Sequence, residues 1–220
     1  MPANDASAAL TDRLVATVSQ VGSALTSPGL YRVLLRLLAS GQPVAIARLA
    51  AAVGHPADEV QRTVAGWPDT EYDEQGRIVG YGLTLRPTPH RFIADGKQLY
   101  TWCALDTLFF PAVIGRAAHV ESPCAATGVL VRFITDPAVG VIALDPATAV
   151  VSIVTPEQVS SVRADFCNPG RFFASHDAAC DWQRKHPGMT VVAVSDAYQA
   201  GRSLSDALLD DGVSRACCTF

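Results

Sequence analysis

The sequence has few charged residues and little excess of either sign. Charged residues make up 17% of the 220 residues and the formal net charge is -4, whereas charged residues form roughly 25% of an average soluble domain. Proteins that bind nucleic acid or anionic membranes by electrostatics carry an excess of Lys and Arg. We therefore expect neither partner. With 49% hydrophobic residues the chain can bury a core, which excludes a disordered or fibrous protein.

The sequence also lacks a secretory signal and a long hydrophobic run. Its first ten residues contain Asp5 and no Lys or Arg, whereas a signal peptide begins with basic residues. The longest apolar run near the N-terminus, residues 33–39, is interrupted by Arg36 and is shorter than the roughly 20 residues of a membrane span. These features predict a cytoplasmic protein.

Several motifs for metal, nucleotide and acyl chemistry are missing. A structural zinc site uses four ligands, usually in close cysteine pairs or with H-x-x-x-H spacing, and neither spacing occurs. Glycine-rich phosphate loops and G-x-S-x-G are absent as well. A cysteine hydrolase would need a histidine base near its nucleophile. His90 or His119 could serve only if the fold brought one of them there.

Cysteine is the residue type that needs explaining. In a reducing compartment, unevenly spaced cysteines are expected to be thiols and not disulfides. Cys124 lies among small residues and is expected to be a buried structural thiol, and Cys180, inside a predicted helix, is expected to lie in the core. None of the six has C-x-x-C spacing: Cys103, Cys124, Cys167, Cys180, Cys217 and Cys218.

The first third of the chain predicts a winged helix-turn-helix module. Apolar residues recur at helical spacing in four segments, and Gly54 is expected to end the third helix. Turn residues between residues 71–72 and 77–85 predict a hairpin. The fourth helix carries Asp58 and Glu59 against a single Arg62, which favours a structural module over a DNA-binding one. The predicted helices are residues 10–25, 30–39, 43–53 and 56–67.

The rest of the chain predicts an α+β domain. Pro87 and Pro89 favour extended backbone and mark a boundary. The predicted fold is therefore a winged-helix-like helical module (1–86), then a mixed or antiparallel β-sheet core flanked by helices (87–212) and a flexible tail (213–220). Predicted strands are residues 129–135, 139–144, 150–154 and 190–194; predicted helices are 99–110, 155–165, 177–185 and 195–209, with Asp177 and Ser195 as N-caps.

The segment from Leu99 to Pro111, LYTWCALDTLFFP, carries the strongest chemical signal. If it is helical, Cys103 and Asp106 lie on one face with side chains roughly 5 to 6 Å apart. Apolar neighbours such as Trp102 would desolvate the carboxyl, raise its pKa and make it a candidate general acid. The alternative is that Cys103 is a small buried hydrophobic residue and that Asp106 caps a helix or faces solvent. Cys167 lies in Asp-Phe-Cys-Asn-Pro-Gly, a predicted turn in which a ligand could reach it.

These segments together resemble the alkylmercury lyases, also called organomercurial lyases. The resemblance lies in the order of Leu99–Pro111, Ile114-Gly-Arg, Cys124-Ala-Ala-Thr-Gly, Phe166-Cys167 and Phe172-Phe-Ala-Ser. It implies cleavage of the carbon–mercury bond of alkyl and aryl mercury compounds, with no cofactor and with external thiols releasing Hg(II). It also implies transfer of Hg(II) to mercuric reductase as a partner.

Carried over to this sequence, the resemblance assigns roles to individual residues. The essential cysteines of the family match Cys103 and Cys167, its essential aspartate matches Asp106, and its structural cysteine matches Cys124. Many members have a second cysteine where this chain has Asn168, and we expect activity to survive this change. Trp102 and its apolar neighbours would accommodate the hydrocarbon group and keep water away.

Two questions stay open at this level. Cys217 and Cys218 look like the terminal cysteine pair with which mercuric reductases pass on Hg(II), so they are a candidate relay; the alternative is a tolerant terminus without a role. A mercury- or thiol-responsive regulator that binds DNA is the alternative to a lyase.

The sequence is compatible with a monomer or a homodimer.

Overall fold

The computed structural model describes residues 27–154 and 161–209 of the chain. The predicted helix at 10–25 and the tail that contains Cys217 and Cys218 lie outside these residues. In chain order the elements are α2 (Pro28–Leu38), α3 (Ile46–Val53), α4 (Ala57–Ala65), β1 (Glu71–Tyr72), β2 (Ile78–Tyr81), β3 (Leu83–Thr84), β4 (His90–Ala94), β5 (Lys97–Thr101), α5 (Asp106–Ile114), β6 (Ala118–Pro123), β7 (Leu130–Asp136), β8 (Gly140–Asp145), β9 (Val150–Val154), η1 (Val162–Cys167), β10 (Phe172–Phe173), α6 (His176–Lys185), β11 (Met189–Ala193) and α7 (Val194–Leu209).

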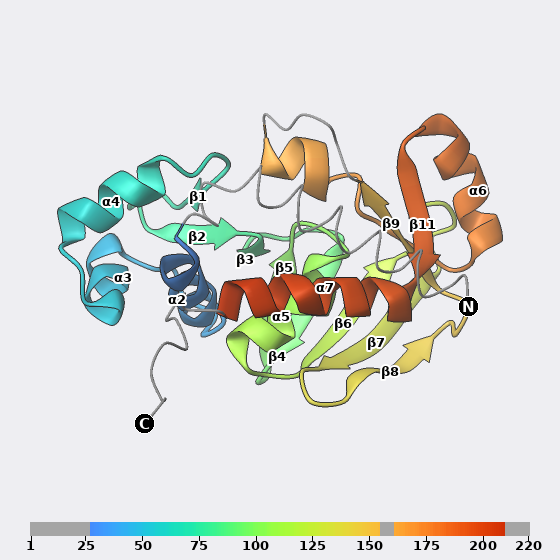
Figure 1. Cartoon of the computed structure of the whole chain (residues 1–220), viewed down its shortest axis with the longest axis horizontal. Helices are drawn as coiled ribbons and strands as arrows, with labels where there is room; N and C mark the ends of the chain where they lie inside the picture. Colours follow the sequence, from blue (N-terminus) through green and yellow to red (C-terminus); the bar gives the residue numbers. More distant parts are fainter. Residues whose placement is uncertain (1–26, 155–160, 210–220) are drawn as a thin grey trace, which may run out of the picture.

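Helices α2, α3 and α4 form the predicted N-terminal module, which lies at one end of the molecule (Figure 1). Their apolar faces are buried, as the helical spacing predicts. Gly54 ends α3 in the left-handed conformation with φ +73. The third helix begins at Ile46 and not at Pro43, because Val44 pairs with Ile78 of β2 through two backbone hydrogen bonds of 2.8 Å.

An antiparallel sheet of eight strands joins this module to the rest of the chain. Its order is β1-β2-β3-β5-β4-β6-β7-β8. The predicted hairpin and the strands near residues 129–135 and 139–144 are confirmed, whereas β4, β5 and β6 were not predicted. The sheet therefore continues across the boundary expected at residue 87, which lies in the loop between β3 and β4.

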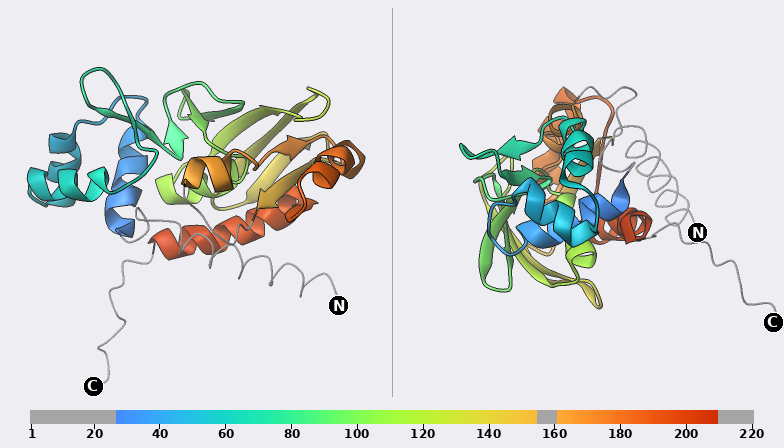
Figure 2. Two further views of the ribbon diagram at one scale, coloured as in Figure 1. Left: turned by 90° about the horizontal axis from the view of Figure 1, so that it is seen from above. Right: turned by 90° about the vertical axis from the view of Figure 1, so that its left-hand side faces the viewer.

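Helix α5 lies at the centre of the core and is covered by α7 (Figures 1 and 2). Eight of its residues are buried, and apart from Asp106 and Thr107 they are apolar, so α5 is enclosed on all sides instead of on one face. Gly201 lets α7 approach closely, because a Cβ there would lie 3.2 Å from the Cβ of Phe109. Beyond them, a second antiparallel sheet has the order β10-β9-β11 and carries α6 on its outside.

The helix predicted over residues 99–110 is wrong in its first half. Leu99 to Thr101 belong to β5, which pairs with β3 and β4, and a turn over residues 102–105 separates this strand from α5. The pairing of three strands stabilises an extended backbone where the apolar pattern alone favours a helix.

Two predicted helix caps are also wrong. The side chain of Ser175, not Asp177, caps α6 by accepting the N–H of Ala178 at 3.2 Å. Ser195 lies inside α7, which begins at Val194. Only residues 161–165 of the helix predicted over 155–165 are described. Ser161 is the N-cap of the π-helix η1, and residues 162–165 belong to η1.

Within the described ranges, every helix is too short or too polar to cross a membrane.

Gly82 gives a test of the packing between the module and α5. Its φ is +76, and a Cβ there would lie 2.7 Å from Cζ of Phe110 and 2.9 Å from the hydroxyl oxygen of Tyr31. Gly54 has a similar φ of +73 but no atom within 4 Å of such a Cβ. Both alanine substitutions incur backbone strain, and overpacking adds about 1 to 3 kcal/mol at Gly82 only. Chemical denaturation should show Gly82→Ala to be at least ~1 kcal/mol less stable than Gly54→Ala; equal stabilities would contradict the packing described.

Candidate active site

Cys103 and Asp106 are neighbours because of a turn between β5 and α5. Cys103 lies in this turn and Asp106 is the first residue of α5. The carboxylate of Asp106 accepts the backbone N–H of Cys103 at 3.0 Å, and the hydroxyl of Thr101 donates to the carbonyl of Cys103 at 2.8 Å. The predicted proximity is therefore observed, but a capping interaction produces it and not a shared helix face.

Cys167 reaches the same place from a distant segment. It is the last residue of η1 and it is buried, whereas an accessible turn was predicted. The carbonyl of Gly170 accepts the N–H of Ala104 at 3.0 Å, and the N–H of Gly170 donates to the carbonyl of Cys167 at 2.9 Å. A Cβ at Gly170 would lie 3.1 Å from the Cβ of Cys103. The absence of a side chain at Gly170 thus permits the close approach of the two cysteine segments.

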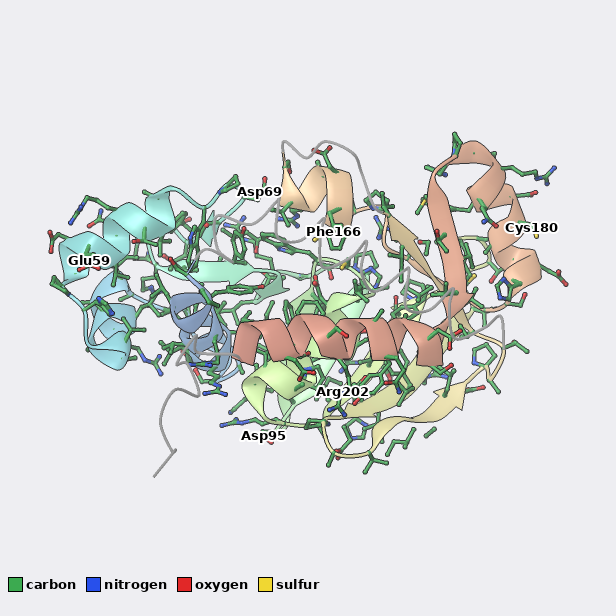
Figure 3. The ribbon with its side chains drawn as sticks, in the orientation of Figure 1. Glu59, Asp69, Asp95, Phe166, Cys180 and Arg202 are labelled. Carbon is green, nitrogen blue, oxygen red and sulfur yellow. The ribbon has the colours of Figure 1, made fainter. Side chains whose placement is uncertain are left out.

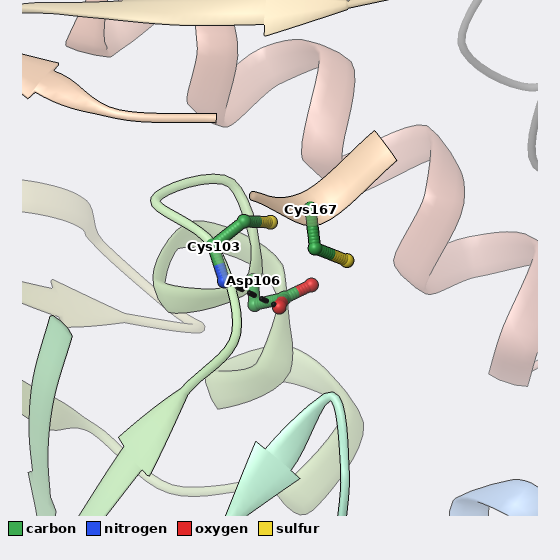
Figure 4. A group of neighbouring side chains, drawn as sticks. All are labelled: Cys103, Asp106 and Cys167. Carbon is green, nitrogen blue, oxygen red and sulfur yellow. Dashed lines mark hydrogen bonds between the residues drawn. The ribbon is translucent and has the colours of Figure 1, made fainter. Parts of the chain in front are cut away.

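The structure brings these three side chains into one cluster (Figure 4). One ligand atom from each of Cys103, Asp106 and Cys167 lies within 4.8 Å of the others. The residues are 1%, 4% and 2% exposed, respectively. In the part of the chain that the structure describes, this is the one group of at least three His, Cys, Asp or Glu side chains close enough to hold a metal ion.

Burial and mutual repulsion favour the protonated forms of the cluster. Burial raises the pKa of Asp106 to about 7, although hydrogen bonds from the thiol and N–H of Cys103 and from the N–H of Trp102 act to lower it. Burial likewise raises the pKa of Cys103. The pKa of Cys167 is raised by its hydrogen bond with Cys103 and then by burial, while the charge of Arg163 acts to lower it. The cluster therefore holds protons near neutral pH that it can pass to a substrate.

The donor set suits a soft metal ion. Thiolates prefer soft ions such as mercury, whereas a carboxylate is a hard ligand that competes poorly for them. Two sulfurs and one oxygen are also fewer ligands than the closed four-ligand cage of a structural zinc site. The cluster can accordingly take up a soft metal through sulfur and leave the carboxyl to handle protons.

Aromatic and apolar side chains surround the cluster. Trp102 is 3% exposed; its ring centroid lies 5.1 Å from that of Tyr81, and the guanidinium of Arg163 lies 5.1 Å from the Trp102 ring. Leu105 and Phe109 are buried on α5 and the turn before it. Tyr31 of α2 is close enough that the charges of Asp106 and both cysteines, after burial itself, raise its pKa. The N-terminal module thus contributes a buried aromatic residue near the cluster.

No histidine belongs to the cluster. His90 is buried with its Nδ1 2.8 Å from the hydroxyl of Ser122, and burial followed by the charge of Arg171 lowers its pKa to about 3. His119 is exposed on β6. The described residues thus give the cysteine-hydrolase alternative no general base.

The remaining cysteines differ in their surroundings. Cys124 is buried, whereas Cys180 is exposed on α6, so its predicted place in the core is wrong (Figure 3). The buried face of α6 is formed instead by Ala179, which packs with Phe173. The structural role of Cys124 stays a prediction.

Comparisons with known proteins show the family of this chain. A family model described as "Alkylmercury lyase" matches residues 83–206, and one described as "Helix-turn-helix domain of alkylmercury lyase" matches residues 6–82. The chain belongs to the alkylmercury lyase family. The second match shows that the winged-helix-like module corresponds to a domain of alkylmercury lyases. The presence of this module is therefore no argument for a DNA-binding regulator.

Curated members of this family align over most of the chain. An alkylmercury lyase of Streptomyces lividans is 53% identical over 209 residues, which cover 95% of this chain and 97% of the relative. The relative from Staphylococcus epidermidis is 51% identical and covers 90% of this chain and 91% of its own length. The one from Pseudomonas putida is 45% identical, with coverage of 83% and 85%.

A solved structure supports the fold. The crystal structure of the mercury-bound form of MerB2 superposes with a TM-score of 0.75 at 21% identity and covers 90% of this chain and 98% of that one. At this identity the likeness concerns the arrangement of helices and strands.

Sequence reasoning missed three residues around the cluster: Tyr31, Arg163 and Gly170. Each comes from a segment whose local pattern predicts only packing, a helix or a turn. The Pro-Gly pair at residues 169–170 was a weak signal, because glycine next to a candidate thiol is typical of a close backbone approach. Tyr31 and Arg163 had no signal, since long-range contacts alone place them there.

The raised pKa of Asp106 predicts a pH-dependent cost in stability. Its pKa is about 7 in the folded protein against 3.8 for an aspartate carboxyl in water, so the stability associated with its protonated form is lost as pH rises through about 7. Asp106→Asn should therefore gain stability over wild type from pH 5 to about 7 and keep that gain above it. Chemical denaturation across this range measures the difference, with the exposed Asp177→Asn as control. A difference that does not change with pH would contradict a raised pKa.

Proposed function

We propose that this chain cleaves the carbon–mercury bond of alkyl and aryl mercury compounds by protonolysis, giving a hydrocarbon and Hg(II). The observation that carries the proposal is the buried cluster of two thiols and one carboxyl within 4.8 Å. Membership of the alkylmercury lyase family supports it. In the proposed division of labour, Cys103 and Cys167 bind mercury and Asp106 is the proton donor.

The first step is capture of the organomercurial cation by Cys103. Its sulfur forms a bond to mercury, its proton passes to the carboxylate of Asp106, and the previous ligand of mercury leaves. The carboxyl is suited to this step because its pKa of about 7 lets it both accept and release a proton near neutral pH.

The second step uses Cys167. Its sulfur adds to mercury, which raises the electron density on the metal and weakens the bond to carbon. The electron pair of that bond takes the proton from Asp106, and the hydrocarbon leaves. The proton of Cys167 then passes to the carboxylate, so Hg(II) remains bound by two thiolates.

Release of Hg(II) is proposed to need external thiols, because two buried thiolates bind a soft ion strongly. No organic cofactor or resident metal takes part in these steps. A cytoplasmic mercuric reductase is the proposed acceptor of Hg(II). Asn168, where many family members have a second cysteine, is proposed to leave the cycle intact, since both sulfurs used in it come from Cys103 and Cys167. A relay through Cys217 and Cys218 stays a prediction.

The hydrocarbon group is proposed to lie against Trp102, Leu105 and Phe109, which are buried and lie within three residues of Cys103 or Asp106 in the chain. Apolar walls favour hydrophobic groups and exclude water, which would otherwise compete for the proton. This places the carbon next to Asp106 while the thiols hold the metal.

Substitution of the three residues tests the roles assigned to them. Cys103→Ala or Cys167→Ala should lower hydrocarbon release from phenylmercury, measured with excess thiol, by at least about 10²-fold, because each removes a group positioned for reaction. Asp106→Ser should still bind Hg(II) but lose about 10² to 10⁴ in release, the usual contribution of a general acid.

Cys180→Ala is the matched control, because Cys180 is an exposed thiol outside the cluster. Its rate should equal that of the wild type. Turnover near the wild-type rate in either active-site cysteine variant would reject the two-thiol mechanism, and undiminished release by Asp106→Ser would reject the carboxyl as acid.

The pH dependence tests whether Asp106 first acts as a base. The carboxylate must be ionised to take the thiol proton, and its pKa is about 7. The second-order rate constant for benzene release in a single turnover of phenylmercury, without added thiol, should therefore rise as pH increases from 6 through about 7. Asp106→Ser should lack this rise. A profile that falls or stays flat over the same range would show that the ionised carboxylate is not needed for capture.

A further inference from the structure

The π-helix η1, which ends at Cys167, is fastened to the N-terminal module at its opposite end. Ser161, the N-cap of η1, donates from its hydroxyl to the carboxylate of Asp69 at 2.9 Å, and the N–H of Arg163 donates to the same oxygen at 3.2 Å. Asp69 follows α4, and Figure 3 shows it beside η1. A single carboxylate oxygen thus anchors the first turn of η1.

A second carboxylate of the module, that of Glu71, holds the side chain of Arg163. One oxygen of Glu71 pairs with the guanidinium and the other accepts the hydroxyl of Thr84. Glu71 is 5% exposed and Arg163 is 36% exposed, so the carboxylate is the buried partner. A Cβ at Gly80 would overlap both Glu71 and Thr84, so the backbone leaves room for this carboxylate.

Arg163 connects this anchor to both cysteine segments. Its guanidinium lies over the ring of Trp102, the residue before Cys103. Its carbonyl accepts the N–H of Asn168, the residue after Cys167, at 2.8 Å. A shift of Arg163 would therefore move Cys167 relative to Cys103, because one turn of η1 separates Arg163 from Cys167. π-Helices are rare and occur often at functional sites.

We propose that Glu71, assisted by Asp69, is a positioning residue for the reaction: through Arg163 and η1 it holds Cys167 where both thiols bind one mercury ion. Glu71 does not touch the substrate. The proposal rests on the proposed function, since it assigns to the module the task of keeping the second sulfur in place. A loss of position by about 1 Å can lower a rate by 10²-fold.

Glu71→Gln tests this with little change in shape. Two quantities are measured: single-turnover release of benzene from phenylmercury, and the concentration of external thiol that removes half of the Hg(II) from loaded enzyme. Both should fall about tenfold, because mercury held by Cys103 without a well-placed Cys167 is lost more readily. Glu59→Gln, which changes an exposed carboxylate of the same module, should stay within about twofold of wild type.

The Cys167→Ala background separates positioning from general destabilisation. Glu71→Gln acts through Cys167, so in this background it should change Hg(II) retention by less than about twofold. An equal loss with and without Cys167, or values of Glu71→Gln within twofold of wild type, would overturn the proposal. If Glu71→Gln does not fold, Asp69→Gly takes its place, since the φ of +68 at Asp69 suits glycine. Failure of the proposed function itself is distinct: Cys167→Ala alone would then release benzene at the wild-type rate.

Discussion

The structure depends on holding one carboxyl and two thiols together away from water. In water these groups would titrate independently, and the carboxyl would be ionised at neutral pH. In the core, burial raises the pKa of all three, and the charges of the neighbouring groups raise the pKa of the two thiols further, so protons are shared within the cluster. The arrangement is costly for an empty protein. Under the proposed function it becomes favourable when a soft cation replaces the thiol protons, so the cost in stability and the proposed chemistry would have the same origin.

The surrounding fold serves mainly to assemble this cluster from two segments. The turn between β5 and α5 supplies Cys103 and Asp106, whose hydrogen bond fixes their separation. η1 supplies Cys167, and Gly170, which has no side chain, leaves room for the Cβ of Cys103. Helix α7 then closes the core over α5, and the apolar character of α5 on all sides follows from this position.

The sequence predicted individual elements better than their assembly. Helical periodicity located α2, α3 and α4, because each has one apolar face. Periodicity failed at β5, because strand pairing stabilises an extended backbone in an apolar run that also suits a helix. It also failed at Cys180, which was expected to be buried beside Trp182 and faces solvent instead. Spacing predicted that Cys103 and Asp106 are close. The turn residues after Cys167 marked it as a candidate thiol, but they could not place it beside Cys103, because that position depends on contacts between distant segments; only the resemblance to a family joined the two cysteines.

The continuous sheet has a consequence for how the two halves of the chain behave. The family models meet between residues 82 and 83, yet β2 and β3 on either side of that point are hydrogen-bonded neighbours, and the carbonyl of Gly82 accepts the N–H of Trp102. A helix-turn-helix unit that reads DNA is commonly a separable module; this one shares its β-ladder with the strand that leads to Cys103. Recombination of family members at this junction would thus change the hydrogen-bonded partners of the strand that leads to Cys103, and would not simply exchange an independent unit.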